Sequence, residues 1–313
     1  MNNMTEIIIG AGASGLACAI RLKQNMPNDE VILLERLDTL GKKILATGNG
    51  RCNLSNEHAK HYREVINFFN NIGLKTKSDS EGRIYPYSNQ AATVRDMLER
   101  ECIRLGVQII TDCTVKSVDR DLIVSTDCGM FYSDSVIIAA GGMAQSSLGS
   151  NGSGYEILKN LGHRITPLSP ALVQLVSSSK YPRQLKGQRV KGNMKMLLDG
   201  ECVKQEYGEI LFTDYGLSGI VSMNLSEAVS KNFECKTPKK CHAVIDLAND
   251  FSEDELLEHI SKFGSLEGIL GEKVSSLLEK QANGDKKKIC KYAKNWQLII
   301  TGTKGFNFAQ ITS

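Results

Sequence analysis

Three glycines and a glutamate near the start of the chain have the types and spacing of a dinucleotide-binding motif. Gly10, Gly12 and Gly15 follow one short apolar run, and Glu35 stands twenty residues after Gly15, at the end of a second apolar run. Because glycine has no side chain, these positions permit a tight turn, the approach of a pyrophosphate to the backbone, and close packing of a helix on a strand. The carboxylate can accept hydrogen bonds from both ribose hydroxyls, which argues against a 2′-phosphate here.

A strand, a helix and a second strand must position these residues. The apolar runs predict strands at residues 6–9 and 31–34, each buried on both faces. Helical spacing predicts a helix between them, which Pro27 ends. Because all of these parts fall at the required distances, a glycine-rich turn without a ligand is the weaker interpretation. The unit does not by itself distinguish NAD from FAD.

The stretch LGKKILATGNGRCNLSN, residues 40–56, is rich in glycine, asparagine and basic residues and has almost no apolar face. Neither a packed helix nor a central strand is expected there. Backbone N–H groups from Gly48 to Gly50 can approach the pyrophosphate and ribityl chain of FAD. Asn49 and Asn53 can offer amides to the ribityl chain or the ring. Three basic side chains can offset the diphosphate charge: Lys42, Lys43 and Arg51.

Several segments, in order, resemble the BaiN/YhiN-like family of FAD-dependent oxidoreductases. They are ERLDTLGKKILATGNGRCNLSN, GRIYPYSNQAATVRDML, SVIIAAGG, GSNGSGYEILKNLGH, PALVQL, GEILFTDYGLSG and GFNFAQITS. The resemblance implies bound FAD, NAD(P)H as electron donor, and reduction of a small organic substrate, with one branch linked to bile-acid or steroid double bonds. Three positions depart from the family pattern: Ala140 in place of a threonine, and Ser153 and Phe308 in place of acidic residues.

The candidate cofactor-binding residues come from the motif, the following segment and the resemblance. Val115 is where related flavoproteins place a valine that meets the adenine, although an ordinary strand valine explains it equally well. Ala140 and Gly141 end a predicted strand in small residues, which lets backbone approach a dinucleotide. The full set is Gly10, Ala11, Gly12, Ala13, Ser14, Gly15, Glu35, Arg36, Lys42, Lys43, Thr47, Gly48, Asn49, Gly50, Arg51, Cys52, Asn53, Val115, Ala140 and Gly141.

The predicted fold class is α/β, with a Rossmann-like FAD-binding domain interrupted by an inserted domain of strands and helices. The first domain would comprise residues 1–165 and 303–313, with a doubly wound parallel sheet and a β meander over 107–132. The insert would comprise residues 166–302. Helices are predicted at 57–71, 91–105, 154–161 and 268–282, and from Ser252 onward. Asp199-Gly200 predicts a hairpin turn.

Composition excludes several classes of protein. The 313 residues carry a net charge of +3, which gives no strong attraction to nucleic acid or membrane. The start has no signal-peptide pattern and no segment is apolar enough to span a bilayer. The nine cysteines are scattered with no C-x-x-C pair, which favours a reducing cytoplasm, no disulfide framework and no metal site.

No catalytic residue can be assigned from the sequence. Tyr85 and Tyr87 could donate a proton, Cys52 could be a redox partner and His163 could lie at the surface; packing explains each of them as well. Two other functions stay open. One is a truncated, weakly FAD-binding and catalytically defective form, because the resemblance implies a further segment after Ser313. The other is a flavoprotein acting on RNA through basic helices.

Overall fold

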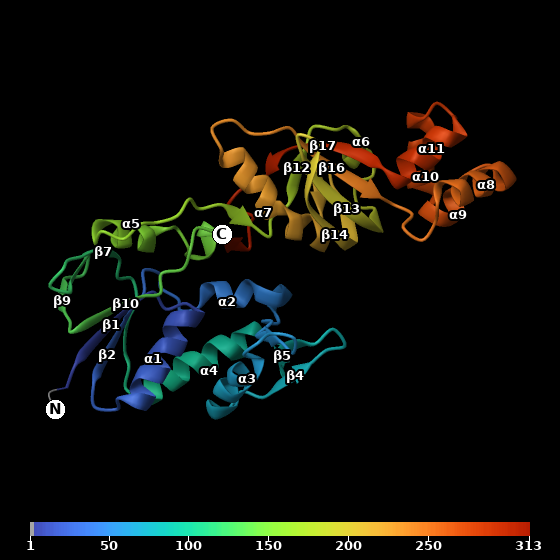
Figure 1. Ribbon diagram of the computed structural model, residues 1–313. Helices are drawn as coiled ribbons and strands as arrows, with labels where there is room; N and C mark the ends of the chain where they lie inside the picture. The colour runs from blue at the N-terminus through green and yellow to red at the C-terminus, as the bar shows by residue number, and fades with distance from the viewer. Residues whose placement is uncertain (1–2) are drawn as a thin grey trace. The chain divides into compact units, whose positions relative to one another are not determined.

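The computed structural model describes residues 3–313, which divide into two compact units. The first unit contains the residues up to Gly142 together with 146–166, and the second contains 143–145 and 167–313. The first is built on a parallel sheet and the second on a closed barrel with helices (Figure 1). The predicted fold class is therefore confirmed.

The first unit is organised by a four-stranded parallel sheet in the order β10-β1-β2-β6. Its strands are β1 (Thr5–Ile9), β2 (Glu30–Leu34), β6 (Gln108–Ile110) and β10 (Ser135–Ile138). Successive side chains alternate between the two faces, as the strand geometry requires. Ile8 and Leu33 pack with α1 (Ala13–Asn25) and α4 (Ala91–Arg104). Ile7 and Leu34 pack with the meander and α5 (Ser153–Asn160).

The meander is an antiparallel sheet of β7 (Val115–Val118), β8 (Ile123–Thr126) and β9 (Met130–Tyr132). It connects β6 to β10, so it lies in the chain between the two outer strands of the parallel sheet. Val118 and Val124 bury its inner face. All three strands fall within residues 107–132, where the sequence predicts a meander.

Residues 40–56 differ from the expectation because a short helix forms there. This is α2 (Lys42–Ala46), followed by a 3-10 turn, η1 (Thr47–Gly50). Helix α2 packs through one buried side chain, Ile44. A helix of five residues is too short to show a periodic hydrophobic pattern in the sequence. A small sheet follows, with β3 (Ser55–Asn56), β4 (Thr76–Ser78) and β5 (Arg83–Pro86). The helix expected from residue 57 begins five residues later, as α3 (Tyr62–Asn71).

The second unit contains a closed barrel in the order β12-β15-β14-β13-β16-β17. The bounds are β12 (Leu175–Ser177), β13 (Arg189–Leu198), β14 (Glu201–Phe212), β15 (Gly216–Ser218), β16 (Cys241–Asp246) and β17 (Trp296–Thr303). Phe212 and Trp296 fill its core. Asp199 and Gly200 both have positive φ, as the predicted hairpin turn requires. Helix α7 (Ile220–Glu234) packs against the strands.

Four helices lie between β16 and β17 in the chain. They are α8 (Glu253–Phe263), α9 (Glu267–Leu270), α10 (Glu272–Gln281) and α11 (Lys286–Lys294). Ser252 and Glu255 form a capping box at the start of α8. The single helix expected over 268–282 is divided at Gly271, whose φ of 76° does not fit a helix. The short helices α6 (Tyr181–Gln184) and η2 (Ser146–Leu148) complete the set for residues 3–313.

Residues 303–313 lie in the second unit, whereas the sequence expectation assigned them to the first domain. Strand β18 (Ile311–Thr312) pairs with β11 (Pro170–Ala171), and Gln145 donates its backbone N–H to Phe306. These local pairings explain the difference. The division between the units falls between Thr166 and Pro167. Within residues 3–313 every helix is too short or too polar to cross a bilayer.

Candidate cofactor site

A cavity of about 560 Å³ lies in the first unit, at the carboxyl end of β1 and β2. In parallel α/β sheets this edge is where ligands bind. The cavity is of the size that holds cofactors and small molecules. Its lining includes the glycine loop after β1, the end of β2 and part of the segment that follows.

The glycine loop has the geometry of a phosphate cradle. A Cβ at Gly15 would overlap the carbonyl oxygen of Gly10, so close packing requires glycine there. A Cβ at Gly12 would meet nothing within 4 Å, so the backbone in front of α1 is open. No side chain among residues 3–313 caps α1, and its first turn carries no acidic residue. Its N-terminal N–H groups and positive dipole end therefore suit an anion.

Glu35 is held by two backbone donors. The Ala11 N–H donates to Oε2 at 2.8 Å, and the Leu37 N–H donates to Oε1 at 2.9 Å. A carboxylate has about four lone-pair positions, so each oxygen keeps capacity for a further hydrogen bond. The carboxylate lines the cavity and is oriented before any ligand arrives. It fits the two hydroxyls of a ribose.

Basic side chains border the cavity at three positions. Arg36 donates to the carbonyl oxygen of Gly149 at 3.1 Å, and the Lys43 Nζ donates to the Ser150 hydroxyl at 2.7 Å. Burial lowers the pKa of the Lys43 ammonium. A nearby anion would compensate for that desolvation. Lys42 also borders the cavity and is exposed.

Arg51 does not border the cavity. Its guanidinium carbon lies 4.6 Å from the centroid of the Tyr85 ring, and its Nη2 is 3.5 Å from the Tyr85 hydroxyl. This stack is a cation–π contact with a residue of β5. The residue is therefore placed to hold the segment against the small sheet rather than beside the cradle.

The turn between α2 and β3 uses its glycine and asparagine for backbone geometry. Gly48, Asn49 and Gly50 all have positive φ, a region that glycine and asparagine adopt most readily. None of the three lines the cavity, whereas Thr47, Cys52 and Asn53 on either side do. The glycine- and asparagine-rich run at 48–50 is thus explained by the turn that brings the flanking residues to the cavity.

The structure brings together fourteen of the twenty candidate residues in the cavity wall. They are Gly10, Gly12, Ala13, Ser14, Glu35, Arg36, Lys42, Lys43, Thr47, Cys52, Asn53, Val115, Ala140 and Gly141. The other six lie outside the wall: Ala11, Gly15, Gly48, Asn49, Gly50 and Arg51. That each of the fourteen contacts a cofactor stays a prediction.

The candidates for catalysis differ in their exposure. Tyr85 is buried beneath Arg51, Tyr87 is 69% exposed and His163 is at the surface. Cys52 lines the cavity, and burial raises the pKa of its thiol, so the thiol stays protonated near neutral pH. No catalytic residue is assigned.

Sequence reasoning missed part of the cavity wall. Gly149 and Ser150 line it and bond the basic side chains, from a loop before α5. Their glycine-rich segment precedes the predicted helix over 154–161, and a glycine-rich helix start carries no sign of a cavity by itself. The wall also includes apolar side chains of α3 and α4: Phe68, Phe69, Val94 and Leu98. Their helical periodicity identifies them as core but carries no sign of a cavity.

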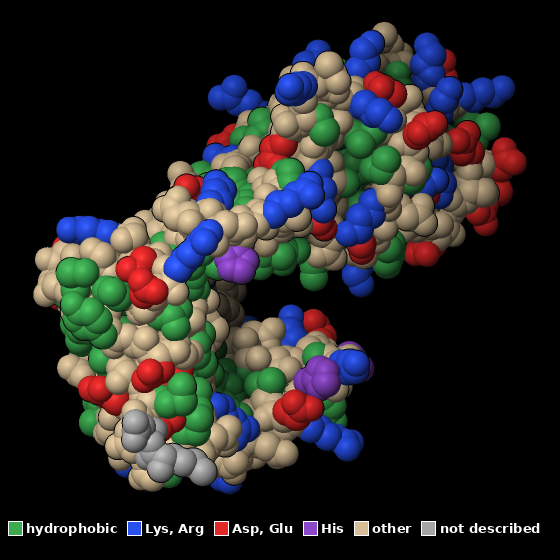
Figure 2. All heavy atoms as spheres, turned by 60° about the vertical axis from the view of Figure 1, so that its left-hand side comes forward, with side chains coloured by type: hydrophobic (Ala, Val, Ile, Leu, Met, Phe, Trp, Pro, Cys, Tyr) green, Lys and Arg blue, Asp and Glu red, His purple; other side chains and the backbone are tan. Residues whose placement is uncertain are grey.

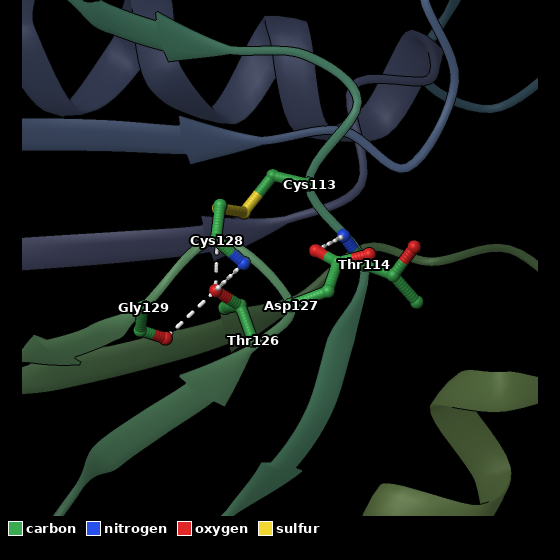
Figure 3. The surroundings of a disulfide bond; sticks show 6 residues. All are labelled: Cys113, Thr114, Thr126, Asp127, Cys128 and Gly129. Atoms are coloured by element: carbon green, nitrogen blue, oxygen red, sulfur yellow. Dashed lines mark hydrogen bonds between the residues drawn. A yellow bond between two sulfur atoms is a disulfide. The ribbon is translucent and has the colours of Figure 1, made fainter.

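One disulfide joins Cys113 to Cys128, although the scattered cysteines predict no disulfide framework (Figure 3). Cys113 precedes β7 and Cys128 lies in the turn between β8 and β9. Pairing of the meander strands brings them together, and no C-x-x-C spacing announces it. With Asp127 they form a possible metal-ligand group, but in the disulfide neither sulfur is a thiolate. The other seven cysteines are free.

The chain is similar in sequence to one described protein family and to a reductase and a synthase of known name. A family model described as "HI0933-like protein Rossmann domain" matches residues 4–63 and 60–305. The 3-dehydro-bile acid delta(4,6)-reductase of Clostridium scindens is 39% identical over 247 residues, 72% of this chain and 60% of that protein. A ribosomal RNA dihydrouridine synthase of Haemophilus influenzae is 24% identical over 98% of this chain and 84% of that protein.

Among solved structures, the open conformation of a flavocytochrome c3 fumarate reductase matches with a TM-score of 0.42 and 14% identity. The match covers 60% of this chain and 47% of that one. A likeness this low supports no statement about activity.

Proposed function

Because the chain belongs to the HI0933-like Rossmann-domain family, we propose that it binds FAD and uses NAD(P)H to reduce a conjugated carbon–carbon double bond of a small organic substrate. The observation that carries the proposal is the cradle of Gly10, Gly12 and Glu35 at the edge of the cavity. The relative from Clostridium scindens supports the choice of substrate class, since its name is that of a double-bond reductase. This chain spans about 60% of that protein's length.

The residues of the cradle would divide the work of holding the cofactor. The N-terminus of α1 would receive the diphosphate over Gly12, and Glu35 would accept the ribose hydroxyls. Lys42 and Lys43 would balance the phosphate charge. When bound, FAD supplies the hydride chemistry. The protein's contribution at this site is binding, orientation and exclusion of water.

The experiment combines binding with turnover. FAD is titrated into the purified chain, and oxidation of NADH and of NADPH is followed without oxygen, with and without a 3-oxo-4,6-diene steroid acid. Saturable FAD binding and steroid-dependent oxidation of one donor are expected. Gly12→Val fills the open space before α1 and should abolish binding, whereas Gly268→Val, at an exposed position outside the cavity where a Cβ also meets no close atom, should not. Failure of the parent to bind FAD contradicts the proposal.

A second candidate is reduction of uridine in ribosomal RNA. It is favoured by the Haemophilus influenzae relative, whose match covers nearly the whole chain. The chemistry is similar, because a dihydrouridine carries two more hydrogens than a uridine. Against it, acidic and basic side chains are interspersed over the face of the second unit that Figure 2 shows. On the basic helix α11, Lys294 pairs with Asp246 and Lys288 with Asp285. Dihydrouridine formed in unmodified ribosomal RNA, measured by nucleoside mass spectrometry, would favour this candidate over the steroid.

A further inference from the structure

The disulfide lies at the end of the cavity that contains Glu35. Cys113 lines the cavity and is 1% exposed, whereas Cys128 is at the surface. The bond links two positions that are 15 residues apart in the chain. The disulfide therefore joins the cavity wall to a sulfur atom that reagents in solution can reach. The proposed function makes no use of this bond.

The segment that precedes β7 positions the wall next to Glu35. The Cys113 N–H donates to the Glu35 carbonyl oxygen at 2.9 Å, and the Asp112 N–H donates to the Leu37 carbonyl oxygen at 3.1 Å. Two residues after Cys113, Val115 also lines the cavity. Residues 111–114 belong to no helix or strand. Their position depends on such individual contacts and on the covalent bond to Cys128.

Hydrogen bonds alone tie this segment weakly to the β8–β9 turn. The Thr114 N–H donates to the Asp127 carboxylate at 2.8 Å (Figure 3). The Asp127 N–H donates to the Thr114 carbonyl oxygen at 3.1 Å. Asp127 is exposed, so water competes for these bonds. Without the disulfide, no covalent cross-link would join Cys113 to the β8–β9 turn, so the wall would open more readily.

We propose that the Cys113–Cys128 pair is a redox control of nucleotide binding. In the disulfide state it fixes the wall beside Glu35, and in the dithiol state the wall loosens and affinity for the nucleotide falls. The proposal rests on the proposed function in one respect, the identity of the nucleotide as FAD. The control is exerted through the wall and involves no electron transfer with the cofactor.

The exchange is chemically complete with ordinary thiol reagents. A dithiothreitol thiolate attacks the exposed Cys128 sulfur, the S–S bond breaks and the Cys113 sulfur leaves and takes a proton. The second thiol of the reagent then releases Cys128 and forms the cyclic disulfide. Two electrons and two protons pass to the pair. Oxidised glutathione reverses the change and is itself reduced to two molecules of glutathione.

The test compares FAD affinity in the two states. The dissociation constant is measured by flavin fluorescence after treatment with dithiothreitol or with oxidised glutathione, with EDTA present to exclude metal. Alkylation and mass spectrometry verify the state of the pair. Reduction of the parent should weaken binding by about fivefold, the equivalent of one neutral hydrogen bond. Cys128→Ser should bind as the reduced parent does under both treatments. Cys202→Ser, which removes an exposed free thiol, should behave as the parent.

Hydrogen exchange of residues 108–116 without FAD supplies a second readout. Reduction should raise exchange in this segment and leave β1 unchanged. Equal FAD affinity in both states of the parent would overturn the redox control while the proposed function stands. Absence of FAD binding in either state would contradict the proposed function. In that case hydrogen exchange tests whether the disulfide holds the wall in place. Unchanged exchange on reduction would overturn that part of the proposal.

Discussion

Replacing Glu35 by glutamine should weaken FAD binding by about one to two orders of magnitude. The change keeps the shape of the side chain but removes its charge, so the two ribose hydroxyls lose a charged acceptor. Hydrogen bonds to charged groups contribute about 1.5–3 kcal/mol, which corresponds to roughly 10- to 150-fold in the dissociation constant. The amide adds a conflict, because its NH2 group must face the N–H of either Ala11 or Leu37.

That conflict predicts a second, smaller effect on the apo protein. One of the two backbone donors loses its acceptor, which costs about 1–3 kcal/mol of unfolding free energy where the donor is buried. Affinity is measured by titration of FAD, and stability by urea unfolding. Glu30→Gln is the matched control, because Glu30 begins β2, the strand that Glu35 follows, is exposed and is outside the cavity. A glutamine variant at position 35 that binds FAD as tightly as the parent would refute the assignment of Glu35 to the ribose.

Three further changes test the geometry of the first unit. Gly15→Ala should lower the unfolding free energy by about 3 kcal/mol, because the new Cβ overlaps a backbone carbonyl. Gly12→Ala should leave the melting temperature unchanged and weaken only FAD binding. Equal melting temperatures for the two variants would contradict this reading. FAD affinity should fall as pH rises through the pKa of Lys43, which burial lowers, because the neutral amine no longer balances the charge of the diphosphate. Lys43→Arg should shift this loss of affinity to higher pH. Identical pH profiles for parent and variant would count against a role of Lys43 in binding the diphosphate. Cys128→Ser should lower the unfolding free energy under oxidising conditions by about 3 kcal/mol, the value for a closed loop of about 15 residues; an unchanged urea midpoint would argue that the bond contributes no stability.

The parts of the site that could be predicted from sequence are those fixed by local geometry. A turn, a helix and two strands within about 30 residues must place Gly10, Gly12 and Glu35 at one edge of a sheet, whatever the rest of the chain does. The hairpin at Asp199-Gly200 and the capping box at Ser252 are local in the same sense. Their chemistry is contained in a few adjacent residues.

The parts that sequence could not give depend on contacts between distant residues. Arg51 was expected near the diphosphate, but Tyr85, 34 residues later, attracts it by stacking and hydrogen bonding. The disulfide depends on the register of the meander, which no cysteine spacing reveals. Helix α2 is too short for a periodic signal, and its only buried side chain is Ile44.

The central claim, that the cavity of the first unit is a FAD site that receives electrons from NAD(P)H, is tested most directly by visible absorption spectroscopy. The purified chain is saturated with FAD, freed of unbound cofactor by gel filtration, and mixed with NADH or NADPH in the absence of oxygen. We expect the visible flavin band to stay with the protein at one equivalent and to bleach with one of the two donors. A colourless protein after gel filtration, or bound flavin that neither donor bleaches, would contradict the account.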